Sequence, residues 1–169
     1  MTTLQLDAEA LYADLLAHLR PLVRHGEGEN AALVGIWSGG AWLAERLQKD
    51  LALPGEHGVI SSTLHRDDFG SRGLAGSDTT SLPFDIDGRH ILLIDDVLYT
   101  GRTTRAVINE LFDFGRPASV TLAVLVDRGG RELPIEPAVS AARVVVPAGQ
   151  KLALVRDEQG RFTLDVESA

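Results

Sequence analysis

Hydrophobic and polar positions follow two different periods along this chain, and each period predicts one kind of element. Asp7 is a suitable helix N-cap, and the leucines after it recur every three or four residues, as on one face of an amphipathic helix, until a turn at 25–28. Short unbroken apolar runs, such as Ala31–Ile36 and Ile91–Ile94, are typical of buried strands. The pattern therefore predicts a folded chain that mixes helices with buried strands.

The predicted elements alternate along the chain. They are helices at 7–24, 41–51 and 103–114, strands at 31–36, 59–64, 91–94 and 120–126, and two or three short strands within 143–166. This alternation indicates an α/β fold around a parallel sheet, in which ligands bind beyond the carboxyl ends of the strands. Three polar, glycine-containing segments follow predicted strands, at Trp37–Gly40, Asp95–Thr104 and Asp127–Glu132. We expect these segments to converge on one crevice.

Composition narrows the class of protein. The chain has 169 residues, 44% of them hydrophobic and 24% charged, and shows no repeat or linker, so we expect one domain over residues 1–169. The absence of cysteine excludes disulfides and thiolate chemistry, and there is no secretory signal or membrane-length apolar run, which predicts a cytoplasmic protein. Sixteen basic against 24 acidic residues give a net charge of −8, which argues against general nucleic-acid binding.

The strongest chemical signal lies between Asp95 and Thr104. Two adjacent carboxylates near the end of a buried strand need a cation, hydroxyls or N–H groups around them. Small hydroxyl-bearing residues and Gly101 then lead into a helix, whose first N–H groups can cradle a phosphate. The segment thus describes a sugar-phosphate site, with an aspartate N-cap before an ordinary helix as the alternative. Neither a Walker A loop nor a GxGxxG fingerprint occurs.

At this segment the chain resembles the type I phosphoribosyltransferases, whose shared motif is an apolar strand, two acids, a short loop, Thr-Gly and a further Thr. The run DDVLYTGRT, followed by LFDFGRPASVTLAVLVDRGGRELPI, is similar to the pyrimidine operon regulator family, which doubles as uracil phosphoribosyltransferase. The likeness is nearly continuous over 87–135, returns at 32–36 and 63–68, and thins in the first helix and after Pro137. It implies a parallel-sheet fold with a small hood formed by the terminal segments.

The resemblance implies that 5-phosphoribosyl-1-pyrophosphate (PRPP) is the ribosyl donor. Asp95 and Asp96 would hold the ribose hydroxyls and, directly or through water, a Mg²⁺ ion as cofactor. The implied donor-binding residues are Ser38, Gly39, Gly40, Asp95, Asp96, Leu98, Tyr99, Thr100, Gly101, Arg102 and Thr103. A plain strand-to-helix turn is the alternative for Trp37–Gly40, and Trp37 itself suits either a core or a stacking platform.

The same resemblance places the acceptor base at Val126, Asp127 and Arg128. An N-cap, or a partner for a neighbouring arginine, is the alternative reading of Asp127. Arg66, at the start of the long polar stretch 66–83, would reach the leaving pyrophosphate and complete a catalytic set with the paired aspartates, whereas a solvated charged loop is the plainer interpretation. A uracil nitrogen would displace pyrophosphate through an oxocarbenium-like transition state, so that orientation and charge stabilisation dominate.

Three departures from the family pattern bear on catalysis. The pyrophosphate loop commonly reads Thr-Arg-Gly but here reads Ser38-Gly39-Gly40, Gly130 replaces a histidine, and a Tyr/Phe-x-Gly-Lys-Asn-x-Pro stretch is missing after Pro137. The lost arginine predicts slow transfer beside good binding of PRPP and uridine monophosphate (UMP), and a gain on Gly39→Arg. The sequence also names no general base: where some relatives acting on purines have an acid, this chain has Tyr99, a phenol that keeps its proton at neutral pH.

Three functions stay open. The first is a uracil phosphoribosyltransferase, the second a nucleotide-sensing regulator of pyrimidine genes acting through RNA or a partner protein with weak or no catalysis, and the third a phosphoribosyltransferase for another base. The resemblance implies a homodimer or homotetramer, and the short apolar runs predict no membrane association. The resemblance also implies RNA as a partner, but the acidic balance predicts RNA affinity no better than non-specific, about 10⁻⁴–10⁻⁶ M.

Overall fold

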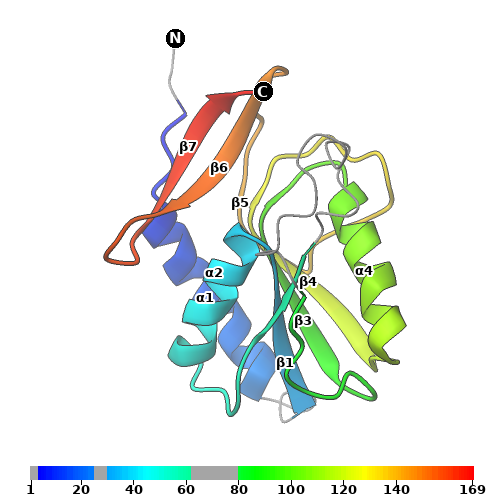
Figure 1. Ribbon diagram of the computed structural model, residues 1–169. Helices are drawn as coiled ribbons and strands as arrows, with labels where there is room; N and C mark the ends of the chain where they lie inside the picture. The colour runs from blue at the N-terminus through cyan, green and yellow to red at the C-terminus, as the bar shows by residue number, and fades with distance from the viewer. Residues whose placement is uncertain (1–3, 25–29, 62–79) are drawn as a thin grey trace.

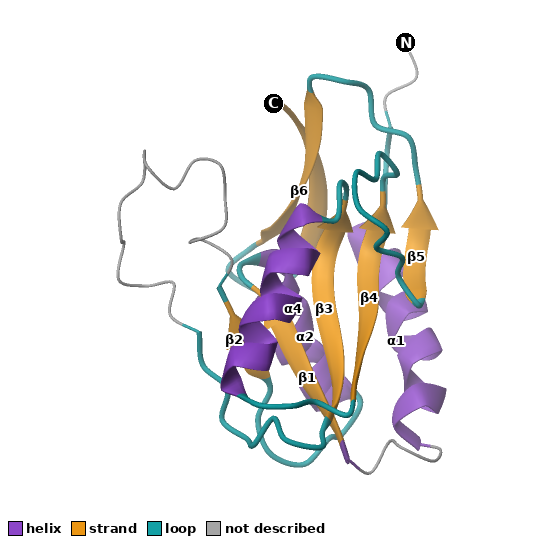
Figure 2. Cartoon of the chain, turned by 90° about the vertical axis from the view of Figure 1, so that its right-hand side faces the viewer, coloured by secondary structure: helices purple, strands orange, loops and turns teal. Residues whose placement is uncertain are grey.

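The computed structural model describes residues 4–24, 30–61 and 80–169, and a parallel sheet lies at its centre. The sheet has five strands in the order β2-β1-β3-β4-β5, and every neighbouring pair is parallel (Figure 2). Their bounds are β1 Ala31–Ile36, β2 Gly58–Ile60, β3 His90–Leu98, β4 Ser119–Asp127 and β5 Val139–Arg143. Because all five run the same way, their carboxyl ends meet at one edge of the sheet, as the alternation of elements predicts.

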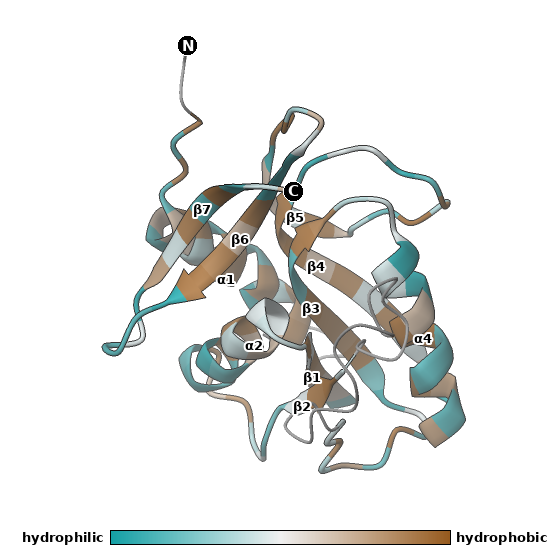
Figure 3. Ribbon diagram, turned by 45° about the horizontal axis from the view of Figure 1, so that its top comes forward, coloured by the Kyte–Doolittle hydropathy of each residue, from teal (hydrophilic) through white to brown (hydrophobic). Residues whose placement is uncertain are grey.

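Helices cover both faces of this sheet. The helices α1 (Ala8–Arg24) and α2 (Gly39–Asp50) lie on one face and α4 (Arg102–Phe114) on the other (Figure 1). Successive side chains of β3 alternate between the two layers: Leu92 packs with α1 and α2, whereas Leu93 packs with α4. Burial on both faces explains why the apolar run of β3 is continuous. Figure 3 shows these apolar strands in brown between helices that carry hydrophilic residues.

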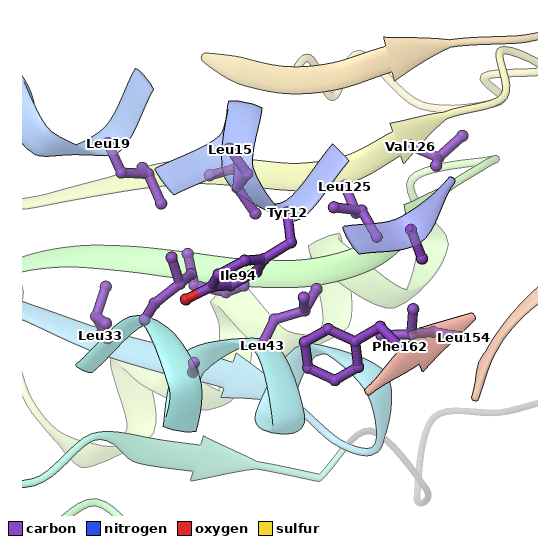
Figure 4. Close-up of a cluster of buried hydrophobic side chains, with 14 of the residues drawn as sticks. Tyr12, Leu15, Leu19, Leu33, Leu43, Ile94, Leu125, Val126, Leu154 and Phe162 are labelled. Carbon is purple, nitrogen blue, oxygen red and sulfur yellow. The ribbon is translucent and has the colours of Figure 1, made fainter. Parts of the chain in front are cut away.

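The C-terminal segment forms an antiparallel hairpin of β6 (Gln150–Arg156) and β7 (Phe162–Ser168). Buried side chains of the hairpin, including Leu154 and Phe162, join the apolar cluster of α1 and α2 (Figure 4). The hairpin therefore lies beyond one end of the sheet, packed on α1 and α2, and corresponds to the hood that the resemblance implies (Figure 1).

An arginine joins the parts of this hood. The guanidinium of Arg46 in α2 lies 4.1 Å from the ring centroid of Tyr12 and 5.1 Å from that of Phe162. The same group donates a hydrogen bond of 2.6 Å to Glu9. One side chain thus contacts the first helix and the C-terminal hairpin together, through stacking and charge.

Most predicted elements are present, with informative differences at their ends. The Ala10 N–H donates to Oδ1 of Asp7 at 3.1 Å, which confirms the predicted N-cap. Strand β3 continues to Leu98, so the paired acids lie within the strand and not after it. Strand β5 was not predicted, because its small, half-buried residues carry no apolar run. Residues 62–64 of the predicted strand 59–64, and most of the polar stretch 66–83, lie outside the described residues. No helix in the described ranges is long and apolar enough to cross a bilayer.

Candidate active site

A cavity of about 250 Å³ lies where the carboxyl ends of β1 and β3 meet the start of the C-terminal hairpin. Residues from five separate segments line it: Ile36, Trp37, Ser38, Gly39, Asp95, Asp96, Val97, Tyr99, Thr103, Arg128, Lys151 and Leu152. Seven of the residues predicted for the donor and base sites are among them, from Ser38 to Arg128. The predicted crevice therefore exists, and its lining is mostly polar or glycine.

The paired carboxylates form one wall of this cavity. Asp95 is 8% exposed, and its Oδ1 accepts the N–H of Asp96 at 2.9 Å. Oδ1 of Asp96 accepts the next N–H, that of Val97, at 2.8 Å. Each bond holds one carboxylate oxygen against the backbone of β3, and both residues line the cavity. Two carboxylates that line the same cavity are suited to hydroxyl groups or a hydrated divalent cation.

The segment Trp37–Gly40, which joins β1 to the first turn of α2, lies directly against the paired acids, and its two glycines make close contacts with them. A Cβ on Gly39 would overlap Oδ2 of Asp96 and lie 2.6 Å from its Cγ. A Cβ on Gly40 would overlap the carbonyl oxygen of Ile94 and lie 3.0 Å from the Cα of Asp95. The peptide bond between Trp37 and Ser38 is cis. An arginine at position 39 would have to displace the Asp96 side chain, so this backbone argues against the expected gain from Gly39→Arg, which stays a prediction.

The predicted phosphate cradle lies at the start of α4. Gly101 is the N-cap of this helix, with a φ of 90°, and as a glycine it has no side chain with which to cap the first N–H groups of α4. The Thr100 hydroxyl accepts the Arg102 N–H at 3.2 Å, and Thr103 reaches the cavity. A glycine is needed at 101 because φ is positive and because an added Cβ would lie 3.0 Å from Ile135.

Several predicted residues lie beside the cavity without lining it. Gly40 is buried beneath the first loop, and Leu98 belongs to the apolar cluster of α4. The Arg102 guanidinium points to Glu132, with Nε donating to its carboxylate at 2.6 Å. Val126 is fully buried in the other cluster. None of these four residues lines the cavity, and Arg66 lies outside the described residues.

The end of β4 holds a buried ion pair. Oδ2 of Asp127 accepts Nη2 of Arg131 at 2.7 Å, and Oδ1 accepts the Gly129 N–H at 3.0 Å. These contacts, the arginine first, hold the pKa of Asp127 below its usual range, and the carboxylate raises the pKa of Arg131 in return. Arg131 also donates to the carbonyls of Tyr99 and Ile135 at 2.9 and 2.7 Å. The alternative interpretation of Asp127, as the partner of a neighbouring arginine, is therefore confirmed for Arg131.

Arg128 is the member of the predicted base-binding trio that lines the cavity. Its guanidinium lies 4.0 Å from the ring centroid of Tyr99, and Nη1 donates to the carbonyl of Gln150 at 3.0 Å. The residue is 8% exposed, and its Nε is buried without a hydrogen-bond partner. A buried cationic N–H of this kind is costly unless an acceptor, such as a water or ligand oxygen, reaches it.

Sequence reasoning missed the contribution of the hairpin. Lys151 and Leu152 line the cavity although they follow the paired acids by more than fifty residues. No spacing or motif signals them, because only the packing of the C-terminal hairpin brings them there. Trp37 does line the cavity, so its position beside the loop was a usable signal.

Comparison with known proteins decides the family. The model of the phosphoribosyl transferase domain matches residues 4–146. The bifunctional protein PyrR of Ralstonia nicotianae is 51% identical over 99% of this chain and 98% of its own length. The chain belongs to the PyrR family of phosphoribosyltransferases. PyrR proteins of Nitrosococcus oceani and Pseudomonas aeruginosa are 46% and 48% identical, over 94% and 87% of this chain and 86% and 80% of theirs. The resemblance to pyrimidine operon regulators is thereby confirmed.

Solved structures confirm the type I phosphoribosyltransferase fold. A hypoxanthine phosphoribosyltransferase from Staphylococcus aureus superimposes with a TM-score of 0.65 at 20% identity, covering 86% of this chain and 78% of that one. A hypoxanthine-guanine enzyme from Leishmania tarentolae, solved with GMP, gives 0.60 at 17% identity, covering 86% and 84%. At such identities the likeness establishes the PyrR-family chain's fold and not its acceptor base.

Proposed function

We propose that this chain transfers the phosphoribosyl group of PRPP to uracil, forming UMP and pyrophosphate, with residues 1–169 acting as one domain. The observation that supports this most is the placement of Asp96 against Gly39. It brings the two carboxylates of the phosphoribosyltransferase motif directly beside a loop stripped of side chains. PRPP carries a ribose with a diphosphate at its anomeric carbon, so its hydroxyls can meet the carboxylates while its diphosphate meets the backbone of this segment.

In this proposal, different segments of the site bind different parts of PRPP. Asp95 and Asp96 accept hydrogen bonds from the ribose hydroxyls, and the backbone of Ser38, Gly39 and Gly40 approaches the pyrophosphate. The 5-phosphate binds at Thr100–Thr103, where helix N–H groups and hydroxyls meet an anion. Leu98 and Tyr99 carry the backbone that leads into this cradle. Arg66 is proposed to reach the leaving group.

The carboxylates of Asp95 and Asp96 are suitable ligands for magnesium, but the ion also needs ligands from the substrate. The described residues hold no group of three or more metal-ligating side chains. Asp95 and Asp96 would therefore hold a Mg²⁺ ion together with water and substrate oxygens, which is how this ion usually binds in phosphate sites. When bound, the ion neutralises charge on the departing pyrophosphate.

Arg128 is proposed to read the base. Its unpartnered Nε–H is a donor and has no acceptor capacity, so it favours a carbonyl oxygen over an amino group. Uracil presents carbonyls where cytosine presents one amino group, which gives a physical reason for preferring uracil. Asp127 and Val126 act by positioning: the Asp127 carbonyl accepts the Val144 N–H at 2.9 Å, and its carboxylate is held by Arg131.

The PyrR relatives are named bifunctional, and regulation of pyrimidine genes through RNA is our second proposed function, in a cytoplasmic homodimer or homotetramer. The net charge of −8 limits any RNA surface to a local patch. A gel shift on the leader of its own pyrimidine genes tests this. Nanomolar binding enhanced by UMP supports regulation, and affinity of about 10⁻⁴–10⁻⁶ M at physiological salt removes it.

A nucleobase panel with PRPP and Mg²⁺ tests the enzymatic proposal. Pyrophosphate release should depend on uracil and exceed that with cytosine, hypoxanthine or guanine. Arg128→Met should reduce this preference, while Arg116→Met, an arginine outside the cavity lining, serves as the control. Release with a purine and not with uracil would refute the assignment of the acceptor. No release with any base, together with no PRPP binding by calorimetry, would refute transferase function.

A further inference from the structure

The donor cavity has few cations for an anionic ligand. Among its described lining residues, Arg128 and Lys151 carry positive charge, against the two carboxylates of Asp95 and Asp96. Pyrophosphate is a polyanion, and its departure needs positive charge in addition to backbone N–H groups. The question is which side chain of the cavity supplies it.

Arg128 is already committed. Its Nη1 and Nη2 donate to the carbonyls of Gln150 and Val146 at 3.0 and 3.5 Å, and its plane lies over the Tyr99 ring. The segment Trp37–Gly40 supplies no cation for pyrophosphate, because a side chain at Gly39 would meet Asp96. The loop can approach pyrophosphate with its backbone alone.

Lys151 is differently placed. It lies near the start of β6, where its register partner across the hairpin is Glu167. Its Nζ lies 3.4 Å from Oε2 of that glutamate, and the two side chains are 56% and 46% exposed. An exposed pair of this kind contributes little to stability, so a polyanion in the cavity can draw the ammonium away.

We propose that Lys151 supplies the positive charge for the pyrophosphate group of PRPP, in place of the arginine that the first loop lacks. The proposal rests on the proposed transferase function. The ammonium donates hydrogen bonds to phosphate oxygens when PRPP binds, and it returns to Glu167 when pyrophosphate leaves. The C-terminal hairpin is then part of the donor site as well as a cover for the core.

Calorimetric titration with three ligands tests the proposal. Pyrophosphate with Mg²⁺, PRPP with Mg²⁺, and UMP are each titrated into the wild-type chain and into Lys151→Met. The variant should lose about tenfold in affinity for pyrophosphate and PRPP, as expected for one charge-assisted contact, and stay within about twofold for UMP, which has no pyrophosphate group.

The chain supplies matched controls. Lys49 is its other lysine and lies outside this cavity, so Lys49→Met should leave all three affinities unchanged. Lys151→Arg keeps the charge and should retain most of the PRPP affinity. Glu167→Gln frees the ammonium without touching it and should raise PRPP affinity about two- to threefold.

Two results would overturn the inference. One is a Lys151→Met variant that binds PRPP and pyrophosphate as the wild type does, and the other is an equal loss for UMP, which would indicate general damage to the site. A wild-type chain that binds no PRPP overturns the proposed function instead, so the two failures are distinguishable.

Discussion

A single methyl group at Gly39 should weaken PRPP binding while leaving the fold in place. The added Cβ would overlap Oδ2 of Asp96 and lie 2.6 Å from Cγ and 3.0 Å from Cβ of the same residue. Asp96 is half-buried, and the hydrogen bond of its Oδ1 to the Val97 N–H is local to β3, so the side chain can give up this bond and its carboxylate can turn away. The turn removes it from the ribose hydroxyls, a loss of about 1.5–3 kcal/mol.

This loss corresponds to a fall of roughly 10- to 150-fold in kcat/KM for PRPP. Stability should change by less than about 1 kcal/mol, because a short side chain can move without the backbone. Gly40→Ala is the contrasting variant: its Cβ meets the Ile94 carbonyl, so it should lower the free energy of unfolding by about 1–3 kcal/mol or more. Steady-state UMP formation at varied PRPP, with urea unfolding of each variant, measures both quantities.

A double-mutant cycle shows whether Gly39 acts through Asp96. In an Asp96→Ala background no carboxylate remains to displace, so Gly39→Ala should then have little further effect on kcat/KM. Additive effects would separate the two residues. Wild-type kcat/KM for PRPP in Gly39→Ala would refute the reasoning altogether.

The remaining predictions concern the two carboxylates, the buried ion pair and one further glycine. Asp95→Asn with Asp96→Asn should abolish Mg-PRPP binding by calorimetry while circular dichroism stays native, and unchanged affinity would contradict their role. Asp127→Asn should lower the free energy of unfolding at pH 7 by about 1.5–3 kcal/mol, because Arg131 loses its partner. Since the folded pKa of Asp127 lies below its unfolded value near 4, this stabilisation is present at neutral pH and is lost as the pH falls through the folded pKa, so the two unfolding curves should converge in acid. A difference that persists at low pH would point to packing instead. Gly130→Ala should weaken UMP binding, because its φ is +77° and the new Cβ would overlap the ring of Tyr99; unchanged binding would show that the ring position does not matter.

The sheet and the motif at its edge could be predicted from local sequence. Unbroken apolar runs identify β1, β3 and β4 because these strands are buried on both faces, and the motif from Asp95 to Thr103 is one continuous segment. Local patterns also identified the first helix down to its capping aspartate. These features share one property, which is that neighbouring residues determine them.

The rest depends on contacts between distant segments. Nothing near Lys151 in the sequence indicates a ligand, since its place at the cavity comes from packing of the hairpin on α1 and α2. The departures at Gly39 and Gly130 read as losses from sequence alone. In the structure each glycine makes room for a side chain of the site, Asp96 in one case and Tyr99 in the other. Such exchanges of space are invisible until the facing residue is known.

The hydrogen bonds of Arg128 to the carbonyls of Val146 and Gln150 link the proposed base site to the segment that enters the C-terminal hairpin. If the base is held by this guanidinium, then an occupied base site holds the guanidinium in turn, and with it the segment that enters the hairpin. Thermodynamic linkage makes this coupling reciprocal. Amide protons of β6 should therefore exchange with solvent more slowly when UMP is bound. Conversely, a ligand that binds and immobilises the C-terminal hairpin should raise the affinity for UMP by the factor by which UMP raises the affinity for that ligand.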